Sequence, residues 1–140
     1  MTTRVLLVRH GATLSSGEDS FNGETDVPLS ELGRDAARAL GRRLADERID
    51  AFYASPLSRA LETARLIAAP HGKEVTPIPD LREVSHGRWE GKLRAEVEDL
   101  YAEEYGRWEA DPFSYGPAGG ETGVAVTARA LPALLGLVGV

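Results

Sequence analysis

Apolar and polar positions alternate along this chain in blocks that predict strands and helices in turn. Residues Val5–Val8 are four consecutive apolar residues, and such a run predicts a strand that is buried on both faces. Short apolar segments at 49–54 and 74–78 predict two further strands, the second near a sheet edge because it contains Pro77. Amphipathic segments lie between and after them. The alternation predicts an α/β fold with a mostly parallel sheet.

The helices of this pattern have recognisable starts. Ser30 is expected to cap a helix that follows a long polar loop from Ala12 to Pro28, and such loops often bind ligands. Ser55 and Pro56 predict the cap and first position of the next helix. The expected core-facing stripes are Leu32, Ala36, Leu40 and Leu44 in the first helix, and Leu57, Leu61, Ala64 and Ala68 in the second.

Two helices are expected in the second half of the chain. The segment 92–110 predicts one helix, and an alanine- and leucine-rich segment from Glu121 onward predicts a last one, disturbed by Pro132. Trp89, Trp108 and Tyr115 lie around these helices, and packing explains them better than a ligand does.

Composition and charge narrow the class of protein. A chain of 140 residues suits one domain, 1–140, and its net charge of -6 argues against a nucleic-acid partner. Cysteine is absent and only three histidines occur, so neither a metal site nor a metal cofactor is expected. There is no apolar run long enough to span a bilayer and no signal-peptide pattern, which predicts a cytoplasmic protein without a membrane partner.

Candidate chemistry begins directly after the first predicted strand. Arg9, His10 and Gly11 stand at its carboxyl end, where α/β sheets usually bind ligands. A nucleophile, an anion-binding group and a turn would fit there. Strand–loop junctions also carry polar residues that have no chemical role. These three residues alone leave both interpretations open.

Four blocks of sequence decide between them. They are Arg9–Thr13, Phe21–Gly33, Ser55–Ala64, and Leu81–Val84 followed by Gly87–Gly91. In order and spacing they resemble the histidine phosphatase superfamily, the phosphoglycerate mutase-like enzymes. The resemblance implies a three-layer α/β/α fold with a mostly parallel sheet. It also implies a phosphorylated small-molecule substrate and a metal-independent reaction through a phosphohistidine.

The resemblance assigns roles to individual residues. His10 would be the nucleophile, and a neutral imidazole suits that role near neutral pH. Arg9 and Arg59 would bind phosphate oxygens, since guanidinium forks match their geometry. Glu83 would be the general acid that protonates the leaving group. Without the motif, Arg59 would be taken for a solvated helix residue and Glu83 for the ion-pair partner of Arg82.

Other positions depart from the family pattern or extend it. Ser16 stands where many relatives carry asparagine, so Asn22 could supply that contact instead, and Gly23 beside it is also expected at the substrate. Val84 replaces the arginine that follows the acidic residue in mutases, which favours a phosphatase over a mutase.

The second histidine of the family is the largest departure. Gly119–Thr122 match the block that precedes it, but the chain stops at Val140, so a C-terminally truncated domain that lacks the last strand or strands is expected. His86 is interpreted as a local variant and His71 as a solvated turn residue. A chain that binds phosphate ligands without turnover is the alternative to an active phosphatase.

The expected loss of the last strand also changes what is expected of the first strand. In the family the missing strand lies beside the first one, so the resemblance implies an open apolar edge at Val5–Val8. Either a second copy of the chain, forming a homo-oligomer, covers this edge, or the sequence is a fragment of a longer protein.

Overall fold

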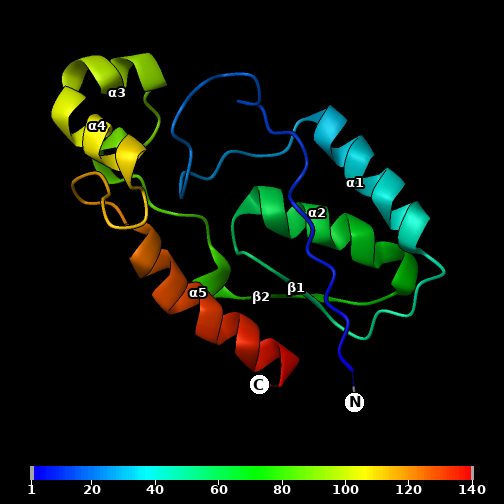
Figure 1. Cartoon of the computed structure of the whole chain (residues 1–140). Helices are drawn as coiled ribbons and strands as arrows, with labels where there is room; N and C mark the ends of the chain where they lie inside the picture. The colour runs from blue at the N-terminus through cyan, green and yellow to red at the C-terminus, as the bar shows by residue number, and fades with distance from the viewer. Residues whose placement is uncertain (1, 140) are drawn as a thin grey trace.

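A small parallel sheet and the helix that connects its strands form the centre of one end of the molecule (Figure 1). The structure is a computed structural model that describes residues 2–139. Strands β1 (Phe52–Ala54) and β2 (Val75–Pro77) pair in parallel, with Phe52 opposite Val75 and Ala54 opposite Pro77. Both strands lie inside the predicted segments. Helix α2 (Ser58–Ala68) connects them and packs against both, as in a βαβ unit.

The start of α2 differs from the prediction. Its first residue is Ser58 and its N-cap is Leu57, so Ser55 and Pro56 precede the helix instead of beginning it. The Oγ of Ser55 accepts a hydrogen bond from the Leu57 N–H and forms a turn. The orphan N–H of Ser58 donates instead to the Asp26 carboxylate, 2.8 Å away. A residue 32 positions earlier therefore caps the helix, which a local pattern does not reveal.

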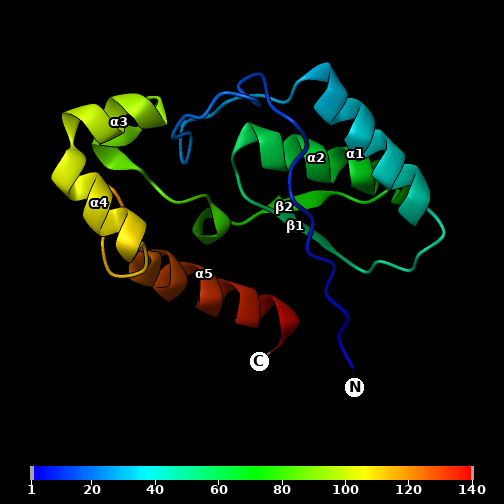
Figure 2. The same ribbon diagram turned by 45° about the horizontal axis from the view of Figure 1, so that its top comes forward.

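The first predicted strand is wrong in its pairing and its burial. Residues Val5–Val8 belong to no helix or strand, and no segment within residues 2–139 pairs with them. Their side chains are exposed, and Leu7 has 82% of its surface accessible. In both ribbon views the segment crosses α2 and the strands (Figures 1 and 2). The sheet therefore has two strands in the described part of the chain, and the three layers are only partly formed there.

Helix α1 (Glu31–Leu44) has the predicted N-cap but buries a different face. The Oγ of Ser30 accepts from the Gly33 N–H at 3.1 Å, as expected. Gly33, Ala37 and Gly41 are the buried residues, whereas Leu32 is 74% exposed, so the predicted leucine stripe is wrong. A Cβ on Gly41 would lie 2.9 Å from the Leu66 carbonyl oxygen. Small residues let α1 approach the α2 backbone closely, and close approach decides which face is buried.

The apolar stripe predicted for α2 is also wrong. The buried residues of α2 are Arg59, Thr63, Ile67 and Ala68, so only Ala68 of the expected apolar set is fully buried. Two polar side chains lie on the buried face because the chain around them supplies their hydrogen-bond partners.

A cluster of aromatic residues forms a second core at the other end of the molecule. The single helix predicted for 92–110 is two helices, α3 (Arg94–Leu100) and α4 (Ala102–Ala110), because Tyr101 leaves the helical conformation with φ -133°. Trp89 is fully buried and packs with Phe21, Tyr105 and Val97, and Tyr101 and Trp108 pack against them. The packing interpretation is confirmed for the two tryptophans. Tyr115 is half exposed.

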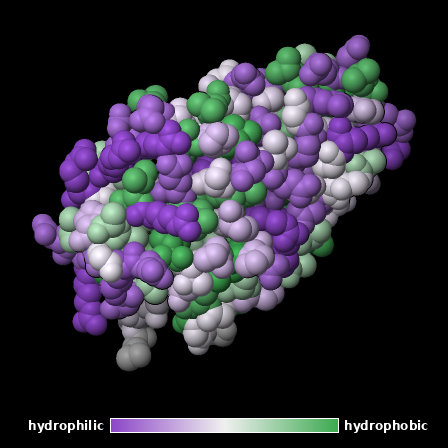
Figure 3. Space-filling view, turned by 180° about the vertical axis from the view of Figure 1, so that it is seen from behind, coloured by the Kyte–Doolittle hydropathy of each residue, from purple (hydrophilic) through white to green (hydrophobic). Residues whose placement is uncertain are grey.

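Short 3-10 turns and a long last helix complete the described chain. The turns are η1 (Ala69–His71), η2 (Pro79–Leu81) and η3 (Gly87–Trp89), and α5 (Gly123–Val138) packs against η2. Helix α5 continues through Pro132. Hydrophobic side chains reach the surface among hydrophilic ones on the rear face (Figure 3). None of the helices in residues 2–139 has both the length and the apolar character needed to cross a membrane.

Candidate active site

The ring of His10 is oriented by its own backbone neighbour. Its Nδ1 lies 2.7 Å from the carbonyl oxygen of Gly11. A carbonyl oxygen can only accept, so Nδ1 carries the proton and Nε2 of the neutral ring keeps its lone pair. Nε2 is therefore the ring nitrogen available as a nucleophile.

Close packing and one hydroxyl hold the turn after His10. The Gly11 N–H donates to Thr63 Oγ1 at 3.2 Å, and the Thr63 hydroxyl donates to the Arg59 carbonyl at 2.7 Å. A Cβ on Gly11 would lie 2.5 Å from the carbonyl oxygen of Gly33, so the backbones of the turn and of α1 are in contact there. The turn is thus fixed between α1 and α2.

The guanidinium of Arg59 is buried and holds a loop. It is only 4% exposed, and it donates to the carbonyl oxygens of Asn22, Gly23 and Thr25. Carbonyl acceptors compensate part of the cost of burying the charge without neutralising it. The positive charge therefore remains available to an anion at the surface of this loop.

Glu90 holds the same loop from the other side. Its carboxylate accepts hydrogen bonds from the N–H groups of Glu24, Thr25 and His86 and from the Thr25 hydroxyl. Partial burial raises the pKa of Glu90, but these hydrogen bonds outweigh burial and the net pKa is lowered. A charged carboxylate thus ties the loop to the segment that follows Glu83.

These segments surround a hollow of about 330 Å³ that we call the His10 hollow. Five of the six predicted site residues line it, from four separate parts of the chain: Arg9, His10, Asn22, Arg59 and Glu83. Its other lining residues are Thr13, Ser15, Ser16, Gly17, Glu18, Ser20 and Val27. Two guanidinium groups and several hydroxyls suit a tetrahedral oxyanion.

Gly23 does not line the hollow. It is buried, and a Cβ there would collide with the Val84 carbonyl oxygen and lie 2.8 Å from Glu90 Oε1. Its role in the structure is to let the loop approach the Val84 backbone closely. Ser16 and Asn22, the alternatives for one phosphate contact, both line the hollow.

Glu83 is exposed and is not paired with Arg82. Its Oε1 accepts from the Val84 N–H at 2.9 Å, whereas Arg82 pairs with Asp80 and Glu121. The interpretation of Glu83 as the ion-pair partner of Arg82 is therefore wrong. Its carboxylate is positioned by the backbone of its own segment and stands at the edge of the His10 hollow.

The sequence did not single out several residues of this site. The hydroxyls of Thr13, Ser15 and Ser20 line the hollow, and the serine- and threonine-rich composition of that loop was the available signal. Thr63 stands four residues after Arg59, so the two share one helix face, and that spacing was its signal.

The other two histidines lie outside the hollow. His86 packs edge-on against Phe21, with ring centroids 5.1 Å apart. Burial lowers its pKa, although Glu90 and Glu83 act in the opposite direction. The prediction of a solvated His71 is wrong, because its Nε2 is buried without a hydrogen-bond partner among residues 2–139 and its ring lies 5.3 Å from that of Phe52.

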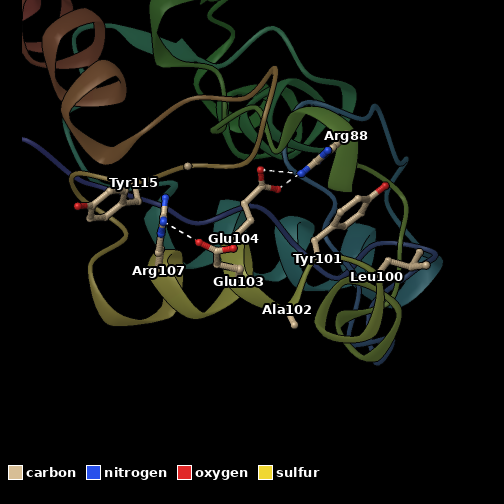
Figure 4. A pocket seen from close by; sticks show the side chains of 9 residues that line it. Arg88, Leu100, Tyr101, Ala102, Glu103, Glu104, Arg107 and Tyr115 are labelled. Atoms are coloured by element: carbon tan, nitrogen blue, oxygen red, sulfur yellow. Dashed lines mark hydrogen bonds and ion pairs between the residues drawn. The ribbon is translucent and has the colours of Figure 1, made fainter.

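A second hollow of about 450 Å³ lies beside α4 (Figure 4). Its charged side chains pair with one another, Arg88 with Glu104 at 2.9 Å and Arg107 with Glu103 at 2.7 Å. Arg88 also stacks over the Tyr101 ring, 4.1 Å from its centroid. Although larger than the His10 hollow, it offers a ligand little uncompensated charge.

The fold and this arrangement of residues agree with comparisons to known proteins. The family model for the histidine phosphatase superfamily (branch 1) matches residues 5–139. The chain therefore belongs to the histidine phosphatase superfamily, and the resemblance seen in the sequence is confirmed.

Relatives named as phosphatases occur beside others named as phosphoglycerate mutases. The chain is 35% identical over 119 residues to phosphoserine phosphatase 1 of Hydrogenobacter thermophilus, covering 85% of this chain and 56% of that protein. It is 35% identical over 135 residues to glucosyl-3-phosphoglycerate phosphatase of Mycolicibacterium vanbaalenii, covering 96% and 60%. The chain thus spans about 60% of the length of these relatives.

Solved structures share the fold. An alpha-ribazole phosphatase from Shigella flexneri superposes with a TM-score of 0.87 at 30% identity, covering 94% of this chain and 65% of that one. A mycobacterial glucosyl-3-phosphoglycerate phosphatase in complex with inorganic phosphate superposes with a TM-score of 0.81 at 33% identity, covering 92% and 59%. The phosphoglycerate mutase-like fold is thereby confirmed, with two parallel strands and five α-helices in the described residues.

Proposed function

We propose that this chain carries the nucleophile and phosphate-binding groups of a phosphomonoester phosphatase. The observation that carries the proposal is that His10, whose Nδ1 lies 2.7 Å from the Gly11 carbonyl oxygen, lines the same hollow as Arg9, Arg59 and Glu83. The names of the phosphatase relatives, and the related structures with inorganic phosphate and with vanadate, support it. Asn22 is proposed as a neutral phosphate contact. Gly23 is proposed to act indirectly, by letting the loop that carries Asn22 pack against the Val84 backbone.

In the proposed reaction Nε2 of His10 attacks phosphorus and the bond to the leaving oxygen breaks. The electron pair of that bond goes to the leaving oxygen, which takes a proton from Glu83. Arg9 and Arg59 stabilise the negative charge on the remaining phosphoryl oxygens. Water then attacks the phosphohistidine, its proton passes to the Glu83 carboxylate, and phosphate and free His10 are released. Two easier displacements replace one difficult step.

Trapping the phosphoenzyme tests this function. Protein incubated with a ³²P-labelled phosphomonoester and quenched rapidly should carry label that is stable to base and labile to acid. His10→Ala should abolish the label, whereas His71→Gln, a histidine outside the hollow, should retain it. A folded wild-type protein that never labels and hydrolyses nothing, or a label that persists in His10→Ala, overturns the proposal.

A phosphate-binding module without turnover is the second candidate. It is favoured by the fact that His10 alone among the three histidines lines the hollow within residues 2–139. Calorimetry with inorganic phosphate separates the two candidates, because this one requires saturable binding from a protein that does not hydrolyse phosphomonoesters. A mutase is less favoured than either, because Val84 follows Glu83 and supplies no charge for a second anionic group.

A homo-oligomer remains a prediction. Val5, Leu6 and Val8 are each close to half exposed and Leu7 is more so, which leaves an apolar surface that a second copy of the chain could cover. Sedimentation at increasing protein concentration tests this prediction. A stable monomer that does not aggregate would count against it.

A further inference from the structure

One guanidinium of helix α5 binds both the backbone around Glu83 and the carboxylate of Glu121. Arg129 donates from Nε to Oε1 of Glu121 at 2.7 Å and from Nη2 to Oε2 at 2.8 Å, a bidentate pair. Its Nη1 donates to the carbonyls of Asp80 and Arg82, at 2.8 and 2.9 Å, and Nη2 also to that of Glu83, at 3.2 Å. An arginine has five N–H donors, and all five have acceptors here.

Glu121 continues the same network on the other side of Glu83. Its Oε2 accepts from the Ser85 N–H at 2.9 Å, and its own backbone N–H donates to the Ser85 carbonyl at 2.8 Å. The Arg129 guanidinium is the main reason that the pKa of Glu121 is lowered to about 2, so the pair stays charged across ordinary pH. Backbone groups on both sides of Glu83 are thus held by one ion pair.

This pair is buried enough to hold a fixed geometry. The side chains of Arg129 and Glu121 are 12% and 18% exposed, against 63% and 83% for the surface pair of Arg107 and Glu103. The Glu83 carboxylate, by contrast, is bonded only to the adjacent Val84 N–H among the hydrogen bonds of residues 2–139. Its location therefore depends on where the backbone of residues 82–85 is held.

We propose that Arg129 and Glu121 are positioning residues that hold Glu83 at the His10 hollow so that its proton reaches the leaving oxygen. The inference rests on the proposed function, in which Glu83 is the general acid. Neither residue lines the hollow. Their effect is exerted through the carbonyls of residues 82 and 83 and the N–H of Ser85.

The dependence of the hydrolysis rate on the leaving group tests the proposal, because a general loss of structure would slow the hydrolysis of both kinds of substrate alike. A simple alkyl phosphate needs a proton on its leaving oxygen, whereas 2,4-dinitrophenolate leaves without one. Glu83→Gln and Arg129→Met should therefore both lower kcat/KM, which reports the steps up to phosphoenzyme formation, by about tenfold or more for the alkyl phosphate and by about twofold or less for 2,4-dinitrophenyl phosphate. Arg129→Lys keeps the positive charge but loses the bidentate geometry of the guanidinium. The fall in kcat/KM for the alkyl phosphate should therefore be intermediate.

Two matched variants define the comparison. Arg107→Met removes an exposed ion pair on α4 and should leave the kcat/KM values for both substrates unchanged. Glu121→Gln removes the charged partner of Arg129 and should give the same leaving-group pattern as Arg129→Met. If Arg129→Met lowers kcat/KM for both substrates equally, its role is structural and the proposal is overturned.

Hydrogen exchange provides a readout that does not need activity. In Arg129→Met, peptides covering residues 82–86 should exchange faster than in the wild type and in Arg107→Met, because the Ser85 N–H loses a well-placed acceptor. Unchanged exchange overturns the proposed positioning. If the wild type turns over neither substrate, the proposed function fails, and exchange alone then decides whether the pair holds the Glu83 segment.

Discussion

The N–H of Gly11 donates a hydrogen bond to Oγ1 of Thr63, 3.2 Å away, and so joins the turn after His10 to helix α2. Because the same hydroxyl donates to the Arg59 carbonyl, one side chain connects the proposed nucleophile with the helix turn that carries the buried guanidinium. Thr63 is 4% exposed, so water does not readily replace either hydrogen bond.

Replacing that hydroxyl should disturb stability and the His10 turn together. Thr63→Val keeps the shape of the side chain but leaves the Gly11 N–H without its acceptor, which should lower the free energy of unfolding by about 1–2 kcal/mol. Phosphohistidine formation should slow as well. Urea unfolding and phosphate labelling measure the two effects. Thr63→Ser keeps the hydroxyl and should retain most of the labelling, and if it loses as much as Thr63→Val, the hydroxyl is not the cause.

Two glycines in helices should respond in opposite ways to the same substitution. Gly33→Ala places a methyl group against the Ala12 carbonyl oxygen, and the backbone shift that follows should cost about 1–3 kcal/mol or more. Gly106→Ala, on the exposed side of α4 with nothing within 4 Å, should stabilise the protein by about 0.5–1 kcal/mol. Urea unfolding measures both. Equal effects would contradict the contact between α1 and the His10 turn.

The Glu121 carboxylate should contribute to acid stability. Since its pKa is lowered from 4.5 to about 2, the contribution is fully present above pH 4.5 and is lost as pH falls from about 4.5 to about 2. The full pKa shift corresponds to about 3 kcal/mol, and solvent screening of this partly exposed pair should reduce the contribution to roughly 2 kcal/mol. The free energy of unfolding of Glu121→Gln should depend less steeply on pH in this window. Glu103→Gln removes the charge of an exposed pair and should alter the profile little; identical profiles for both variants would contradict this prediction.

The half-buried ring of His86 should make the free energy of unfolding depend on pH in a higher range than the Glu121 carboxylate does. Burial lowers its pKa below the ordinary 6.5, so the unfolded chain binds more protons than the folded one as pH falls. Stability from the neutral ring is therefore present above pH 6.5 and should decline below it. His86→Phe keeps a ring against Phe21 and should remove this part of the pH dependence in urea unfolding experiments. A wild-type stability that rises between pH 6.5 and 5.5 relative to that of His86→Phe would contradict the assignment.

The site was more predictable than the packing around it. His10, Arg59 and Glu83 belong to sequence blocks whose order already implied one phosphate site, and the structure places them around one hollow. The Ser30 cap and the parallel pairing of β1 and β2 were predictable because caps and short apolar strands depend on neighbouring residues. The close approach of Gly23 to the Val84 backbone and the hydrogen bond of Thr63 to Gly11 were not, because both are contacts with distant backbone.

By itself, the sequence determined the family, the strand–helix–strand unit of β1, α2 and β2, and the chemical groups available for phosphate. Only the tertiary structure decided that small residues, and not leucines, face inward on α1, and that Asp26 caps α2. It also decided that Val5–Val8 pair with no strand among residues 2–139 and that Arg129 holds the segment of Glu83. The physical reason is the distance along the sequence over which each interaction acts. Caps and periodicity depend on residues within one helical turn or strand. Close backbone approach and buried hydrogen bonds join residues tens of positions apart.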